Sequence, residues 1–313
     1  MTNTKATDKG KYRAKGEIGS LCLLAAVLLF GLALSGESAE YVKDGMRLAV
    51  GCVIPSSFPF MIISDFYVIY GRPENIRPLR AVLKNVFGLP PQGLGAFILG
   101  NIGGFPIGAK ICADAYSIGL ISKEDAERLL PLCNNPSCAF IVGGVGMGMW
   151  ADIRVGMILL ASVFSATLMC ALITRTKGDK SSFTAYKSEQ KYDFISSVKS
   201  SGSSTIGIIS FISLFSVALG IIKKRVSYAS ILYPLYAFSE VTNAVNAFTL
   251  DTAFPPVLRL AACAFALGFG GICVGMQSSF FTSQSELKMT RYYKIKLLEG
   301  LLSASFATLF YQI

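Results

Sequence analysis

Long apolar runs separated by short polar segments dominate the chain. The run Ile18–Leu34 contains no charged residue. A helix of roughly 20 apolar residues spans a bilayer, so runs of this length predict membrane-spanning helices rather than buried helices of a soluble protein. Further runs of similar length and mostly apolar composition are Ile153–Ile173, Thr205–Ile222, Val257–Thr282 and Ile295–Ile313. The pattern predicts an all-α, multi-pass integral membrane protein, whose first span is Ile18–Leu34 rather than a cleaved signal.

Several of the apolar stretches contain residues that interrupt helices. Glycine costs helix stability and proline removes a backbone donor. Broken backbone at membrane depth is tolerated only where it is buried in protein or lines a cavity. We therefore expect functional helix breaks, although glycines that let two helices pack closely are the alternative interpretation. The predicted break residues are Gly103, Gly104 and Pro106 in GNIGGFPIGAK, Pro136 in CNNPSC, and Gly270 and Gly271 in GFGGICVG.

Charge supports the membrane interpretation and predicts an orientation. Only 15% of residues are charged, 52% are hydrophobic, and the net charge of +10 comes from basic residues that fall mostly in loops. Basic loops favour the cytoplasmic side, which places the N-terminus inside. Three apolar stretches separate the basic loops near Lys84 and Arg175, so one of them, Gly93–Tyr116, is predicted to be re-entrant. A simple crossing by Thr205–Ile222 would place the basic cluster beginning at Lys223 outside, so the helix over Thr205–Ile222 is also predicted to be interrupted.

The apolar and interrupted segments follow one another in a similar order twice. The stretch from Ala39 can be aligned with that from Asp193, GNIGGFPIGAK with FSEVTNAVNA, and CNNPSCAFIVGG with LGFGGICVGMQ. Such a pattern suits two related halves around a shared midplane site. The predicted organisation is a basic cytoplasmic N-terminus (1–17), a first membrane half (18–173), a polar cytoplasmic loop (174–200) and a second membrane half (201–313).

Polar side chains within the apolar stretches are the candidate solute-binding residues. Burying such groups alone is costly, so we expect them to meet in one cavity near the midplane, with Lys110 at its edge. Glu240 is interpreted as the only acid deep in the spans of the second half, and hence as a coupling group. Asp114, one turn from Lys110, can neutralise that lysine. The full set is Asn101, Lys110, Asn134, Asn135, Glu240, Asn243 and Gln277.

The sequence offers little support for an enzyme. It has no histidine, no phosphate-binding GxxxxGK[ST] loop and no CxxC pair among its eight cysteines. These absences argue against histidine-based proteases, nucleotide hydrolysis and common metal sites. We therefore predict no catalytic residue, no metal and no cofactor. The basic residues do not interleave with aromatic ones on a helix, so a nucleic acid is not an expected partner.

Several segments resemble the sporulation integral membrane proteins of the YlbJ type, which belong to the group with nucleoside-recognition, or Gate, domains. The segments are GFPIGAK, GLISKEDAERLLPLCNNPSCAFIVG, EVTN and GFGGICVGMQ. The resemblance implies a multi-pass protein of the cell membrane connected with spore cortex formation. Two function classes remain open: a permease for a small polar, nucleoside-like solute, and a non-transporting assembly or scaffold factor. Expected partners are the lipid bilayer, the solute, and a second copy or other sporulation membrane proteins.

Overall fold

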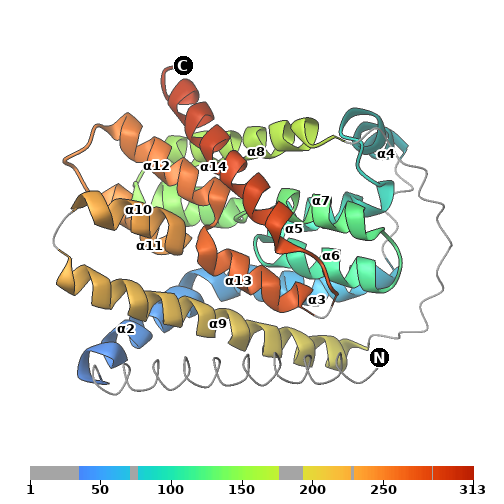
Figure 1. The fold of residues 1–313 in the computed structure, drawn as a ribbon, viewed down its shortest axis with the longest axis horizontal. Coiled ribbons are helices and arrows are strands. Elements are labelled where there is room, and N and C mark those ends of the chain that lie inside the picture. Colours follow the sequence, from blue (N-terminus) through green and yellow to red (C-terminus); the bar gives the residue numbers. More distant parts are fainter. Residues whose placement is uncertain (1–34, 71–76, 176–192, 227–228, 284) are drawn as a thin grey trace, which may run out of the picture.

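The computed structural model describes residues 35–70, 77–175, 193–226, 229–283 and 285–313, and every regular element within them is helical (Figure 1). The predicted span Ile18–Leu34 lies outside these residues. The α-helices are α2 (Ser35–Leu48), α3 (Ile54–Tyr70), α4 (Arg77–Ala81), α5 (Leu94–Gly103), α6 (Ile107–Ser117), α7 (Lys123–Leu132), α8 (Ile153–Ile173), α9 (Phe194–Arg225), α10 (Ala229–Ser239), α11 (Val241–Leu250), α12 (Pro256–Phe269), α13 (Gly271–Thr282) and α14 (Met289–Tyr311). The segments η1 (Ala49–Val53), η3 (Val82–Val86) and η5 (Phe140–Met149) are π-helical, and η4 (Pro91–Gly93) is a short 3-10 helix.

Three stretches of helix in the described residues are long and apolar enough to cross a membrane. They are Ile153–Ile173, Phe194–Arg225 and Pro256–Thr282, and the last of these comprises α12 and α13. Their mean hydropathies of 2.2, 2.3 and 2.0 exceed what a soluble surface helix carries. The prediction of an all-α membrane protein is confirmed.

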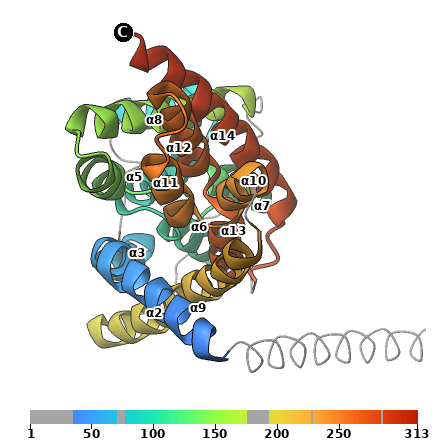
Figure 2. The same ribbon diagram turned by 90° about the vertical axis from the view of Figure 1, so that its left-hand side faces the viewer.

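A long antiparallel helix pair forms one side of the molecule. The continuous helical segment α2–η1–α3 runs along α9 in the opposite direction (Figure 1), and these helices lie together at the lower side of the molecule in Figure 2. A Cβ atom at Gly45 would lie 2.6 Å from the Cα of Ser213. Further along, Ser197 Oγ donates a hydrogen bond of 2.5 Å to Asp65 Oδ2. Because α9 is unbroken over its 32 residues, the predicted interruption of Thr205–Ile222 is wrong.

Helices α5 and α6 fold back on each other as a hairpin. A Cβ atom at Gly100 on α5 would lie 2.9 Å from the Cα of Gly108 on α6. At the tip, Gly104 has a φ of +86°, a conformation that side chains with a Cβ atom rarely adopt. Helix α5 ends at Gly103 and α6 begins at Ile107, so the break lies where the glycine and proline cluster predicts it.

Helices α10 and α11 form a second hairpin with Glu240 at its tip. The rings of Tyr233 on α10 and Phe248 on α11 stack with their centroids 5.7 Å apart. These two residues are nearly equidistant in sequence from Glu240, as an antiparallel hairpin requires. The Glu240 side chain accepts hydrogen bonds from the backbone N–H groups of Thr242 (3.0 Å) and Asn243 (2.7 Å). It therefore caps the N-terminus of α11, where a carboxylate is favoured.

Each hairpin is followed by an interrupted helix. Residues 133–137, which include Pro136, separate α7 from the helical turn that leads into η5, and Gly270 separates α12 from α13. The same order therefore occurs twice: a long helix, a hairpin, an interrupted helix and a final helix, α8 or α14. In Figure 1, α10 and α11 lie to the left and α5, α6 and α7 to the right, with α13 between them in contact with α6, α10 and α11. The residue boundaries predicted for the two halves remain a prediction.

The short amphipathic helix α7 begins with a side-chain cap at Ser122. Ser122 Oγ accepts a hydrogen bond of 3.1 Å from the backbone N–H of Asp125 and donates one of 2.7 Å to its carboxylate. We expect Ser122→Ala to reduce the free energy of unfolding by about 1 kcal/mol, the usual contribution of such a cap. Thermal unfolding in detergent measures this effect. Ser305→Ala on the exposed face of α14 is the control, and equal shifts for the two variants would contradict the prediction.

Candidate solute site at the helix breaks

The tip of the first hairpin packs directly against the first interrupted helix. A Cβ atom at Gly104 would lie 2.7 Å from the backbone nitrogen of Ser137. Cβ atoms at Gly100 and Gly108 would lie 2.1 Å and 1.9 Å from the carbonyl oxygen of Cys133. Contacts below 3.0 Å essentially never occur for real Cβ atoms. Only glycine at these positions lets the hairpin reach the broken backbone.

The second half repeats this junction. Gly271 has a φ of +77°, and a Cβ atom there would lie 2.7 Å from the carbonyl oxygen of Ser239. Ser239 precedes Glu240, the tip of the α10–α11 hairpin, so the second tip meets the break between α12 and α13. Each half thus brings together two sets of backbone ends that are free of helical hydrogen bonds. Interrupted helices in transporters use such groups to hold solutes and ions.

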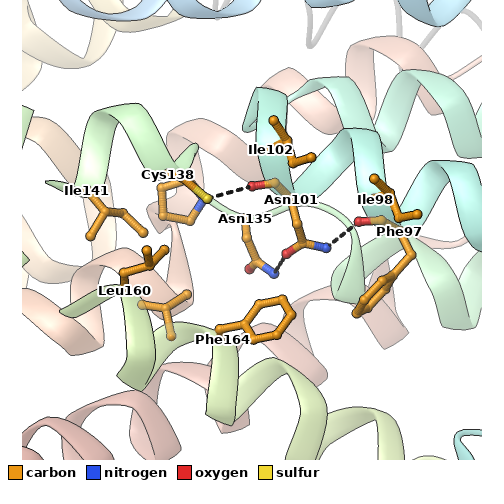
Figure 3. Close-up of a pocket in the computed structure, with 11 residues that line it drawn as sticks. Phe97, Ile98, Asn101, Ile102, Asn135, Cys138, Ile141, Leu160 and Phe164 are labelled. Atoms are coloured by element: carbon orange, nitrogen blue, oxygen red, sulfur yellow. Dashed lines mark hydrogen bonds between the residues drawn. The ribbon is translucent and has the colours of Figure 1, made fainter. Parts of the chain in front are cut away.

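Two asparagines meet at the first junction, as Figure 3 shows. Asn135 Nδ2 donates a hydrogen bond of 2.9 Å to Asn101 Oδ1. Asn101 Nδ2 donates to the carbonyl oxygens of Phe97 (2.7 Å) and Leu132 (3.2 Å). Leu132 is the last residue of α7, so the amide of Asn101 satisfies a carbonyl group that the break leaves without a helical partner. The pair joins the hairpin to the interrupted helix.

A cavity of ≈ 210 Å³ lies beside this asparagine pair. In Figure 3 the two amides lie between the phenyl rings of Phe97 and Phe164 and the thiol of Cys138. Cys138 is exposed, whereas the other cysteines of known burial within the described residues are buried. Apolar walls with a few converging polar groups are typical of small-molecule sites. The lining residues are Phe97, Ile98, Asn101, Ile102, Asn135, Pro136, Cys138, Ile141, Leu160, Val163 and Phe164.

A fully buried ion pair is hydrogen-bonded to Asn135. Lys296 Nζ on α14 donates hydrogen bonds to Asn135 Oδ1 (2.6 Å) and Glu299 Oε2 (2.9 Å). Thr167 Oγ1 on α8 donates to Glu299 Oε1 (2.5 Å) and accepts from Asn135 Nδ2 (3.0 Å). Lys296 and Glu299 are 0% exposed. The network ties the first helix break to a helix of the second half.

The sequence interpretation missed this pair. It treated the run from Ile295 as apolar and Glu240 as the only acid deep in the second half, and the buried Glu299 shows that this is wrong. The sequence did contain a signal for this pair. Two opposite charges three residues apart within an apolar stretch can neutralise each other, which allows the helix that carries them to be buried.

Asn134 and Gln277 lie at the interface of the two halves. Asn134 Nδ2 donates hydrogen bonds to Ser278 Oγ on α13 (2.8 Å) and to the Tyr292 hydroxyl on α14 (2.9 Å). Gln277 precedes Ser278, and its Nε2 donates to the Sγ of Cys273 (3.3 Å). The Oδ1 atom of Asn134 is buried without a hydrogen-bond partner among the described residues. Neither amide lines the cavity beside Asn101.

The remaining predicted residues lie elsewhere, so the expectation of a single cavity is not met. Asn243 donates to Glu240 Oε2 (2.8 Å) and lines a second cavity of ≈ 340 Å³ beside the α10–α11 hairpin. Lys110 lines neither of these two cavities. It is buried and forms ion pairs with Asp65 on α3 and with Asp114 (2.8 Å). The physical reason is that each hairpin encloses its own polar groups, while an aspartate from α3 neutralises Lys110.

Comparison with known proteins supports the membrane assignment. The chain is 25% identical over 325 aligned positions to the sporulation integral membrane protein YlbJ of Bacillus subtilis (strain 168). The alignment covers 88% of this chain and 78% of that protein. No protein-family model matches the chain. No solved structure matches it either. The chain is thus similar to an integral membrane protein of sporulation, and the nucleoside-recognition domain remains a prediction.

Proposed function

We propose that the protein is a multi-pass permease of the cell membrane that moves a small polar solute during sporulation, with its N-terminus in the cytoplasm. The observation that carries the proposal is the repeated junction of a hairpin tip with an interrupted helix, at Gly104 in one half and Gly271 in the other. A protein that only held others together would have no need of interrupted backbone inside an apolar core. The similarity to an integral membrane protein of sporulation supports the setting.

The cavity beside Asn101 and Asn135 fits a small neutral solute with an apolar face and a few hydrogen-bonding groups. Its ≈ 210 Å³ suits a small molecule rather than a peptide segment. The residues that line it carry no charge, and the Lys296 bound to Asn135 is neutralised by Glu299. Phe97 and Phe164 offer rings against which a flat group can pack. A nucleoside has this combination of features and is the first class to test.

Transport requires that the site open to each side of the membrane in turn. In the proposed cycle the two halves move against each other, and the hairpin tips open and close at the breaks. The contacts that must rearrange include those between Asn135 and Lys296 and between Asn134 and Tyr292, because they join one half to the other. Such small sets of polar contacts between rigid helices can break and reform within a transport cycle.

We expect purified protein in liposomes to take up a radiolabelled nucleoside, and Asn135→Leu to reduce that uptake by about tenfold or more. Loss of the amide removes hydrogen bonds worth roughly 1–3 kcal/mol where they are buried. The control is Asn85→Leu, which makes the same change at an exposed asparagine in η3. Binding of the solute should also slow alkylation of Cys138 by N-ethylmaleimide, since the thiol lies at the cavity.

The scaffold alternative predicts a different result. If a strain lacking the protein regains normal spores with Asn135→Leu, and neither uptake nor Cys138 protection occurs with a panel of nucleosides and other small neutral solutes, the permease proposal is wrong. Normal uptake by Asn135→Leu would show instead that the cavity beside this residue is not the solute site.

A further inference from the structure

The carboxylate of Glu299 is completely enclosed among the helices of both halves. It accepts hydrogen bonds from Lys296 Nζ on its own helix and from Thr167 Oγ1 on α8. Lys296 in turn donates to Asn135 at the first helix break. One ion pair therefore holds α14 of the second half, α8 of the first half and the interrupted backbone together. The protonation state of this carboxylate can influence how the halves fit.

A buried ion pair is a poor choice if stability alone is required. Apolar residues of similar volume at such sites are often as stabilising or more so. Ionisable groups within membrane spans mark ion and proton pathways in many transporters. The location of Glu299, two hydrogen bonds from the cavity residue Asn135, favours such a functional role over simple packing.

Few titratable groups surround the Glu299 carboxylate. On α14 these are Lys296 and Tyr292, and on α8 the nearest is Cys170. Thr167 on α8 and Asn135 at the first break also interact with the carboxylate, and neither of these side chains titrates. Tyr292 is engaged as a hydrogen-bond partner of Asn134. Glu299 is therefore the group in this network whose negative charge a proton can remove while Lys296 stays positively charged.

We propose that Glu299 is the proton-binding site of the protein, and that its protonation releases Lys296 and so separates α14 from the break at Asn135. The inference rests on the proposed permease function and names its coupling ion. A hydronium ion transfers a proton to Oε2 of the carboxylate and becomes water, which leaves a neutral carboxylic acid. The Lys296 ammonium keeps its charge and loses its hydrogen bond to Oε2, and no other covalent bond forms or breaks. An ammonium left without a counter-ion in an apolar interior is costly, so α14 must shift to bring it to water or another anion.

Glu240 is less suited to this role than Glu299. Its two oxygens accept hydrogen bonds from two backbone N–H groups and one side-chain amide at the start of α11. These donors fix the side chain at the start of α11, where it serves as the cap of that helix. We assign Glu240 to the hairpin tip as a cap. The variant Glu240→Gln is therefore a matched control that removes an acid of the same half without touching the Lys296 network.

The test follows Cys138, which lies three residues beyond Asn135, at the cavity. Membranes containing the protein are treated with N-ethylmaleimide over a series of pH values, and alkylation of Cys138 is quantified by peptide mass spectrometry. A cysteine introduced by Ala253→Cys, in the exposed turn before α12, corrects for the effect of pH on thiol reactivity itself. The measured quantity is the rate at Cys138 divided by the rate at residue 253.

In the otherwise unchanged protein this ratio should change severalfold between mildly basic and mildly acidic pH. In Glu299→Gln it should stay at the acidic value throughout, because glutamine imitates the protonated acid. Glu240→Gln should keep the pH dependence. If Glu299→Gln does not fold, the double variant Lys296→Met/Glu299→Leu, which lacks both charges, should give a ratio that is independent of pH. A pH dependence that persists in the Glu299 variants would overturn the proposal. The result does not depend on identifying a solute, so it is separate from the uptake test.

Discussion

Gly108→Ala is expected to prevent the first half from folding normally. A Cβ atom at this position would lie 1.9 Å from the carbonyl oxygen of Cys133 and 2.5 Å from its carbonyl carbon. Both atoms belong to the backbone of the first helix break and cannot rotate away. Overpacking of a side chain usually costs roughly 1–3 kcal/mol, and a backbone obstacle should exceed that range. The expected result is loss of monodisperse protein after detergent extraction.

Gly202→Ala provides the control for this substitution. Gly202 lies inside α9, and no atom comes within 4 Å of the position of its Cβ. Alanine there should be neutral or should stabilise the helix by roughly 0.5–1 kcal/mol, because glycine is the poorer helix former. Extraction and thermal unfolding of the two variants can be compared directly. Normal behaviour of Gly108→Ala would mean that α6 does not approach the break as closely as the structure indicates.

The position of the helix breaks was predictable, but the contacts between them were not. Clusters such as Gly103–Pro106 announce a break because glycine and proline weaken a helix locally. Gly108 belongs to the same cluster of helix breakers, but it lies within α6 and not in the break itself. What requires glycine there is the carbonyl of Cys133, 25 residues away in sequence. Only the tertiary arrangement of hairpin and interrupted helix reveals it.

The error over α9 has a physical explanation. The argument from basic loops assumed that each apolar run crosses the membrane once and that a basic cluster marks the cytoplasm. Helix α9 has 32 residues, which corresponds to a length of about 48 Å at the usual rise per residue. It is therefore longer than a bilayer core of about 30 Å, so the basic cluster in its last turn can lie beyond the hydrocarbon at the end of an unbroken helix. Loop charge does not determine helix continuity.

The sequence pointed to polar residues that need a partner, but it could not show which of them lie together. Asn101 and Asn135 stand out as isolated polar residues in apolar stretches, and they do meet beside a cavity. Asn243 stands out equally but belongs to the other hairpin. Sequence shows which polar groups need a partner, whereas the fold decides which partner each receives. Lys296 and Glu299 neutralise each other's charge within one helical turn. Neither therefore stands out in the sequence as a polar group that needs a distant partner.

Removing only one charge of this pair should be far more damaging than removing both. In Lys296→Met the Glu299 carboxylate stays buried and keeps the hydrogen bond from Thr167 but loses its counter-ion. Breaking a buried ion pair in this way typically costs about 3–5 kcal/mol. Lys288→Met, at an exposed position just before α14, is the matched control and should change stability little. Thermal unfolding in detergent at a fixed pH gives the comparison.

The double variant Lys296→Met/Glu299→Leu leaves no uncompensated charge in the interior. Methionine and leucine are similar in length to the residues they replace and can fill the space between α14 and α8. Replacement of a buried ion pair by apolar residues is often neutral, or stabilising by about 1–4 kcal/mol. The double variant should therefore unfold at or above the temperature of the unchanged protein, although Asn135 loses one hydrogen-bond donor. If the two charges act independently, the double variant will instead be less stable than either single variant. A double variant that is as stable as the unchanged protein but has lost the pH response at Cys138 would show that stability does not require the ion pair. The two charges would then be needed for the pH response.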